Sequence, residues 1–364
     1  MMSDNERGRE SGWGHSLFLV FMWGAVILGV VISIVPSVQN RIANLGQIEC
    51  SHTTTLSPQG TPPPAPSPTS PSILKLSSDE LNQLRYHGLP PVVLGANPAA
   101  QLHAEDMLVN DYFGHWWADG RKPYMVYTQT GGASYVSENA ATSGWTYGEW
   151  AANDCNTSYV RCKVPTPKEA ITDHQWGMMY DDAHADWGHR DNILGKSHRT
   201  VNIGIGFNGL RTIFVQHFEG GAVQADGPPV LDQNGELCLS LSKRETGIDV
   251  GGISIAYDPP PTPKTPTQID ALNRYCTGGG FTVHCSEFDA TTILKPPQPG
   301  RYYSNLNANE VVASRWVDSP SHFTMAARMG SLLEKPGVYT VIAWRNDGEE
   351  RFSEKLVELS LFVE

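Results

Sequence analysis

Positive charge is scarce in this chain of 364 residues, in which 26 Lys and Arg stand against 38 Asp and Glu. Charged residues make up only 18% of the chain, and the formal net charge is -12. The sequence contains no basic stripe. Because affinity for a phosphate backbone depends on clustered Lys and Arg, this balance argues against nucleic acid as a partner.

Cysteine is also sparse, with 6 residues and no Cys-x-x-Cys spacing, which argues against a structural zinc site built from cysteines. Two pairs of cysteines lie close together in the sequence: Cys155 with Cys162, and Cys276 with Cys285. Such short loops predict two disulfides and an oxidising compartment. The pairing of Cys50 and Cys238 stays open.

Long apolar runs are rare, but residues 16–35 form one that carries no charge. A helix of this length spans about 30 Å, the thickness of the hydrocarbon core of a bilayer. A cleaved signal peptide has a shorter apolar stretch, and no cleavage site stands out after Pro36. We therefore expect a transmembrane signal anchor over 16–36, preceded by a cytoplasmic tail over 1–15.

The next segment is rich in Pro, Ser and Thr, which favours extended polyproline II and predicts a stalk over 37–76. A proline-rich ligand for a recognition domain is the alternative. Together with the expected disulfides, the anchor and the stalk predict a single-pass protein of the cell membrane. The bulk of the chain would then lie outside the cytoplasm.

Residues 77–220 show signals of helices followed by strands. Capping-box patterns at Ser77 to Glu80 and at Thr166 to Glu169 predict two helix starts, and Pro98 predicts a third. Asn208-Gly209 separates two apolar runs and predicts a β-hairpin. Helices that precede strands in this way favour an α-β-α or α+β packing.

Residues 221–364 show the alternation of short strands. Ile253 and Ile255 alternate with polar or small residues, and so do the apolar residues of 323–329. Two apolar runs near the C-terminus, 337–344 and 355–363, predict a terminal hairpin in a small antiparallel β-sandwich. We expect each half to fold by itself. A shortened chain that ends near Asp226 should therefore fold cooperatively.

Several short motifs follow one another between residues 81 and 206. They include Gly88-Leu89-Pro90, Tyr112-Phe113-Gly114-His115, Ser137-Glu138-Asn139-Ala140-Ala141 and Gly188-His189-Arg190-x-Asn192. In this order they resemble the CAP superfamily, the cysteine-rich secretory, antigen 5 and pathogenesis-related proteins with an SCP-like extracellular domain. The resemblance implies an α-β-α sandwich for 77–220, and the β-rich half resembles the tail of some bacterial members.

The resemblance also implies a central cavity in which two histidines and two acidic residues bind a divalent metal. His115, Glu138 and His189 match three of these positions, and we assign the fourth to Asp181, with Asp182 as the alternative. Imidazoles and carboxylates suit Zn²⁺ or another divalent cation. The same groups could instead form a hydrogen-bonded cluster without metal.

Other polar residues lack such support. His184, His198 and His217 are predicted to be surface or structural, and Ser137 to be a turn residue at a strand end. Two functions follow. The first is a binding or interaction module for a small-molecule, lipid or cell-envelope ligand. The alternative is an extracellular, peptidase-like hydrolase in which Glu138 and His189 activate water, although no known catalytic motif occurs.

Overall fold

The computed structural model describes residues 71–85, 88–144, 166–209, 211–272, 288–346 and 354–364, all within one compact unit over 52–364. The helices of these residues are α2 (Pro71–Leu84), α3 (Ala99–Val109), α4 (Pro123–Gln129), α5 (Pro167–Tyr180), α6 (Gly188–Ile193) and α7 (Pro266–Asp270), with 3-10 turns η2 (Ala183–Ala185) and η3 (Gly330–Leu333). The strands are β1 (Val93–Leu94), β2 (Val136–Gly144), β3 (His198–Phe207), β4 (Arg211–Gly220), β5 (Val223–Ala225), β6 (Val230–Leu231), β7 (Glu236–Lys243), β8 (Val250–Asp258), β9 (Phe288–Leu294), β10 (Glu310–Val312), β11 (Arg315–Asp318), β12 (His322–Arg328), β13 (Gly337–Arg345) and β14 (Lys355–Val363).

The first sheet has the strand order β1-β3-β4-β2, so that β2 lies at an edge. Strands β3 and β4 pair in antiparallel fashion on either side of Asn208 and Gly209, which confirms the predicted hairpin. Gly209 has a φ of 87°, and the Asn208 side chain accepts a hydrogen bond from the backbone N–H of Arg211 at 2.9 Å. Both features are typical of a tight turn with this dipeptide.

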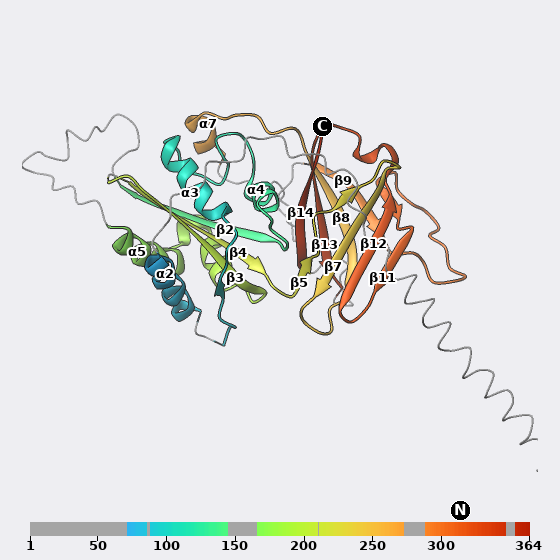
Figure 1. Cartoon of the computed structure of the whole chain (residues 1–364), viewed down its shortest axis with the longest axis horizontal. Coiled ribbons are helices and arrows are strands. Elements are labelled where there is room, and N and C mark those ends of the chain that lie inside the picture. The colour runs from blue at the N-terminus through green and yellow to red at the C-terminus, as the bar shows by residue number, and fades with distance from the viewer. Residues whose placement is uncertain (1–70, 86–87, 145–165, 210, 273–287, 347–353) are drawn as a thin grey trace, which may run out of the picture. The chain divides into compact units, whose positions relative to one another are not determined.

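Helices pack on both faces of this sheet (Figure 1). On one face α3 places Ala100, Ala104 and Met107 against Ile213 and Val215 of β4. On the other face α2 and α5 form a second apolar cluster with β3 and β4, through residues that include Leu81, Ile171, Met178, Val201, Phe214 and Phe218. Successive side chains of a strand point to opposite faces, so each strand serves both clusters.

The capping signals gave one correct and one wrong helix start. Thr166 and Glu169 form the predicted capping box at the start of α5. Ser77, in contrast, lies inside α2, which begins at Pro71, so the end of the predicted stalk is helical. Ile73 and Leu74 pack on the same cluster as Leu81, and this continuous apolar face extends the helix past the serine.

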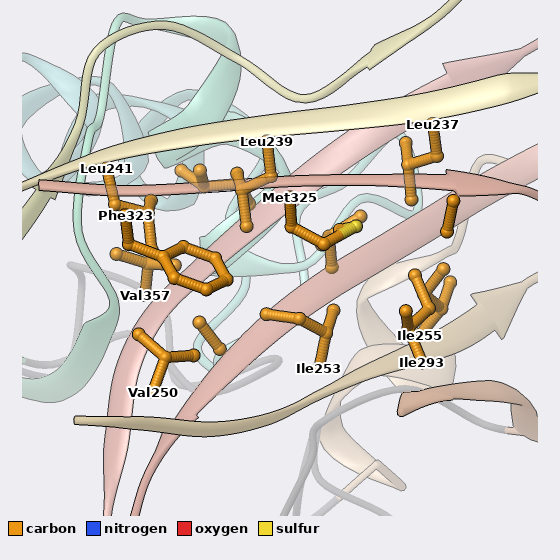
Figure 2. Packing of buried hydrophobic residues seen from close by; sticks show 14 of the residues in the cluster. Leu237, Leu239, Leu241, Val250, Ile253, Ile255, Ile293, Phe323, Met325 and Val357 are labelled. Carbon is orange, nitrogen blue, oxygen red and sulfur yellow. The ribbon is translucent and has the colours of Figure 1, made fainter. Parts of the chain in front are cut away.

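Two further sheets form the C-terminal part, with strand orders β10-β9-β8-β13-β14 and β11-β12-β7-β5, and β6 also pairs with β7. Their facing sides enclose one apolar core (Figure 2). Its members include Leu237, Leu239 and Leu241 of β7, Phe323 and Met325 of β12, and Val250, Ile253 and Ile255 of β8. Strands β13 and β14 are antiparallel neighbours, which confirms the predicted terminal pair.

Direct contacts join α4 to the C-terminal sheets. Lys122 Nζ lies 2.7 Å from Asp258 Oδ1, and the Tyr124 hydroxyl donates to Asp258 Oδ2 at 2.7 Å. Val338 of β13 belongs to the same apolar cluster as Tyr124, and Ser360 of β14 donates its backbone N–H to Thr128 Oγ1 at 3.1 Å. Independent folding of the two halves stays a prediction.

The predicted fold class, an α-β-α CAP sandwich followed by a small antiparallel β-sandwich with a transmembrane helix, is wrong for the chain as a whole. The described residues contain more strand than helix, and their strands form three sheets. Strand β10 is parallel to β9, so the C-terminal sheets are not purely antiparallel. The three helices that the sequence did not predict, α4, α6 and α7, have only 5 to 7 residues each.

The predicted membrane location is also corrected. No helix in the described ranges is long and apolar enough to cross a bilayer. The longest of them, α2 and α5, have 14 residues each and measure about 21 Å, short of the hydrocarbon core. The run 16–36 on which the single-pass prediction depended, and the tail over 1–15, lie outside the described residues.

The predicted disulfides are not part of the described structure. Cys155, Cys162, Cys276 and Cys285 lie outside the described ranges. Cys238 in β7 is the one cysteine within them, so no disulfide joins two described residues, although Cys238 is not a free thiol.

Candidate metal centre

Glu138 lies at the centre of a group of three imidazoles. It projects from the edge strand β2 and is directly opposite His217 of β4 in the antiparallel register. The carboxylate oxygen Oε2 lies 2.6 Å from His217 Nε2 and 2.7 Å from His103 Nδ1, and Oε1 lies 2.6 Å from His115 Nδ1. We call Glu138 with these three histidines the Glu138 cluster.

The three histidines come from different elements. His103 belongs to α3, between Ala100 and Met107 of its inward face, and its ring stacks on Trp117 at 4.8 Å between centroids. His217 is fully buried within β4. His115 lies in the loop after α3, and 24% of its side chain is exposed. Solvent therefore reaches the cluster at His115.

The electrostatics of the cluster favour a charged carboxylate. Glu138 is 3% exposed, and burial by itself would raise the pKa of its carboxyl group. The charge of His103 and the hydrogen bonds from His103, His115 and His217 act in the opposite direction. Together they hold the pKa of Glu138 well below its usual range.

Three of the four side chains can hold a metal ion. Ligand atoms of His103, Glu138 and His217 all lie within 4.8 Å of one another, and all three residues are buried. His103 Nε2 and His217 Nδ1 are buried without a hydrogen-bond partner in the described structure. A metal ion would replace the ring protons that now face Glu138, because a coordinating imidazole nitrogen carries no proton.

The present distances are those of hydrogen bonds. Zinc bonds of about 2.0–2.2 Å in tetrahedral geometry place two ligand atoms roughly 3.3 Å apart. The nitrogens of His103 and His217 lie 2.7 Å and 2.6 Å from the Glu138 oxygen. Metal entry therefore requires the ligand atoms to separate by about 0.6 Å.

A second histidine–carboxylate pair lies at the start of α6. His189 Nδ1 is 2.6 Å from Asp182 Oδ1, while Asp182 Oδ2 accepts the backbone N–H groups of His189 at 2.9 Å and Arg190 at 3.1 Å. Asp182 is buried, whereas Asp181 is an exposed residue that ends α5. The carboxylate beside His189 is thus the alternative, Asp182.

The predicted site residues meet in two pairs, His115 with Glu138 and His189 with Asp182. The second pair is tied to β2 by Asn139, whose side chain donates to the His189 carbonyl at 3.1 Å. Adjacent residues of a strand point to opposite faces, so Glu138 and Asn139 serve different faces of β2.

Ser137 has no place in the Glu138 cluster. It lies within β2, opposite Phe218 of β4, and not in a turn. The alternation of the strand directs its hydroxyl away from the face on which Glu138 lies. The prediction of a turn at Ser137 is therefore wrong.

Sequence reasoning missed His103 and took His217 for a surface or structural residue. For His103 a signal existed, because it recurs at helical spacing with Ala100, Ala104 and Met107. The role of His217 could be recognised only with the knowledge that β2 pairs with β4. His184 is exposed and His198 is buried, and neither joins the Glu138 cluster.

No protein-family model matches this chain, and no curated protein matches it either. The resemblance to the CAP superfamily therefore rests on the motifs in the sequence.

Proposed function

We propose that this protein is a binding module whose Glu138 cluster holds a divalent metal ion of the Zn²⁺ type. The observation that carries the proposal is the contact of one buried carboxylate with three imidazoles. Zinc is bound in proteins by imidazole nitrogens and carboxylate oxygens.

Two ligand sets are open to such an ion. The inner set consists of His103, Glu138 and His217, whose ligand atoms already lie close together. The outer set is the one predicted from the sequence: His115, Glu138, His189 and Asp181, with Asp182 as the alternative to Asp181. We favour the inner set, because all three of its side chains are buried, whereas Asp181 of the outer set is exposed.

The lowered pKa and the contacts of Glu138 favour a binding role for the protein over hydrolysis. A general base must accept a proton from water, and its pKa should lie near the working pH. The pKa of Glu138 is held well below its usual range, and both of its oxygens face imidazoles. His189 is paired with Asp182 and not with Glu138.

Membership of the CAP superfamily is part of the same proposal. What supports it is the order of the motifs between residues 81 and 206 and the contact of His115 with Glu138. Neither observation names the ligand, so its class, whether a small molecule, a lipid or a cell-envelope component, follows from experiment.

The test is Zn²⁺ titration by calorimetry, with metal content measured on the purified full chain. We expect the wild type and a His115→Ala/His189→Ala variant to bind Zn²⁺. A His103→Gln/His217→Gln variant should lose tight binding. The exposed His184→Ala serves as the matched control. Circular dichroism and thermal melting show whether each variant folds.

Loss of binding only in the His115→Ala/His189→Ala variant would move the site to the outer set. Should the inner variant fail to fold, Glu138→Gln replaces it, since the amide keeps one acceptor oxygen and removes the charge. Equal Zn²⁺ affinity in all variants would show that the cluster is a hydrogen-bonded network without metal, and would overturn the proposal.

A further inference from the structure

The outward face of α5 carries large aromatic side chains. Trp176 is 57% exposed and Tyr180 is 48% exposed, and their ring centroids lie 5.7 Å apart. They are four residues apart, so they share one side of the helix. The opposite side of α5 packs into the protein through Ile171, Met178 and Met179. This helix therefore has apolar groups on both sides, and other described residues cover only one of them.

A third aromatic residue lies just beyond the end of α5. The backbone N–H of Trp187 donates to the carbonyl of Asp182 at 3.1 Å, and its side chain is 38% exposed. The guanidinium carbon of Arg190 lies 5.3 Å from the centroid of the Trp187 ring. We call Trp176 and Tyr180 the aromatic face, and Trp187 is a separate exposed ring.

Acidic residues lie next to these aromatic residues in the sequence. Asp173 lies one helical turn before Trp176, Asp181 follows Tyr180, and Asp186 precedes Trp187. All three aspartates are exposed. The surface thus combines aromatic rings with negative charge, which is the combination that attracts cations. The same charge, with a net -12 over the chain, disfavours anionic lipid and nucleic acid.

We propose that the aromatic face binds a cationic peptide segment of a partner protein. Arg or Lys side chains of the partner would stack on Trp176 and Tyr180 and pair with Asp173 and Asp181. The stacking of Arg190 on Trp187 shows the same contact within this chain. Gly177, between the two aromatic positions, has open space in front of it, so a side chain of the partner can approach the helix there. The proposal is independent of the metal site.

The test is fluorescence anisotropy of two labelled nine-residue peptides with the full chain, one alternating Gly with Arg and one alternating Gly with Glu. We expect binding of the Arg peptide only. Trp176→Ala/Tyr180→Ala should weaken it about tenfold, because two exposed cation–π contacts are lost. Tyr302→Ala removes an aromatic side chain that is 89% exposed in the C-terminal part, and it is the matched control.

Charge is tested separately with Asp173→Asn/Asp181→Asn, against Glu334→Gln as an exposed acidic control. We expect weaker binding and a smaller dependence on salt in the aspartate variant only. Weakening by the aspartate variant without any effect of the aromatic variant would show long-range attraction to an acidic protein and would overturn the proposal. The proposal would also fail if both peptides bind equally. It would fail likewise if the protein binds phosphatidylcholine vesicles through the aromatic residues but does not bind the Arg peptide.

Discussion

His198, at the start of β3, is a buried imidazole outside the Glu138 cluster. It is 4% exposed, and its ring stacks on Phe218 with 5.1 Å between centroids. Its Nδ1–H donates to the carbonyl of Asn192 at 2.9 Å. Burial lowers the pKa of His198 to about 4. The folded protein therefore keeps this ring neutral under conditions in which an unfolded chain would protonate it.

This difference makes the free energy of unfolding depend on pH. The unfolded chain takes up the proton near pH 6.5 and the folded chain only near pH 4, so the contribution is fully present above about 6.5. As the pH falls from about 6.5 to about 4, the free energy of unfolding decreases by at most about 3 kcal/mol through His198. We expect urea denaturation to show a smaller loss between neutral and acid pH in His198→Phe than in the wild type. An equal loss in both would contradict this assignment, and His184→Ala is the exposed control.

Asp182 and Asp181 make a matched pair of adjacent carboxylates. Asp182→Ala removes the acceptor of two backbone N–H groups and of His189 Nδ1. Unsatisfied buried donors should lower the free energy of unfolding by about 2 kcal/mol. Asp181→Ala should change it by less than about 0.5 kcal/mol, as expected for an exposed position. Thermal or urea unfolding checks both values, and the opposite order would show that Asp181 anchors α6.

The site residues could be predicted only as far as local patterns allow. The motifs placed His115, Glu138 and His189, and each of the three contacts a carboxylate or an imidazole: His115 pairs with Glu138, and His189 with Asp182. They could not separate Asp182 from Asp181, because helical spacing was extended beyond Tyr180, where α5 ends. The role of His217 depends on the strand opposite Glu138, and a pattern within one strand does not identify that neighbour.

At the scale of elements, the approach of α3 to β3 depends on a glycine. A Cβ atom at Gly204 would overlap the carbonyl group of Ala100 in α3. Because backbone atoms cannot move aside as a flexible side chain can, Gly204→Ala should push α3 away from the sheet. We expect a loss of at least about 2 kcal/mol in the free energy of unfolding.

Gly177→Ala is the control for this prediction. Nothing lies within 4 Å of a Cβ atom at Gly177, which is inside α5. Alanine should therefore stabilise the helix by about 0.5–1 kcal/mol. Urea denaturation of both variants gives the comparison, and equal effects at the two positions would mean that α3 does not pack on Gly204 in solution.

Elements defined by neighbouring residues were predictable. The capping box of α5 and the Asn208–Gly209 hairpin are local, and both were correct. The start of α2 was wrong because tertiary packing of Ile73 and Leu74 extends the helix past Ser77. The pairing of β2 with β4 brings together residues far apart in the sequence, and no local signal specifies it.

At the scale of the whole molecule, a buried ion pair joins α4 to the C-terminal sheets. The side chains of Lys122 and Asp258 are 1% and 3% exposed. Lys122→Met would leave the Asp258 carboxylate buried without its cation, at a cost of about 3–5 kcal/mol. The exposed pair Lys75–Asp79 gives the control, because Lys75→Met should cost less than about 0.5 kcal/mol. Thermal melting measures both, and a small effect of Lys122→Met would show that water reaches Asp258.

The fold class of the whole chain was harder to predict than its parts. The strand alternation at Ile253, Ile255, Phe323 and Met325 was visible in the sequence, and these residues face one another in one core. The order of strands in the sheets was not visible, nor was the parallel pairing of β10 with β9. Those depend on contacts between distant segments, which periodicity does not encode.

The position of Glu138 directly opposite His217 also bears on misfolding. A slip of β2 by one residue would turn the carboxylate to the other face of the sheet, among Phe214 and Phe218, where an unpaired charge costs several kcal/mol. A slip of two residues would place it opposite Val215 or Glu219. Each slipped pairing thus carries an electrostatic penalty that the observed one lacks, so the carboxylate favours the observed register of β2.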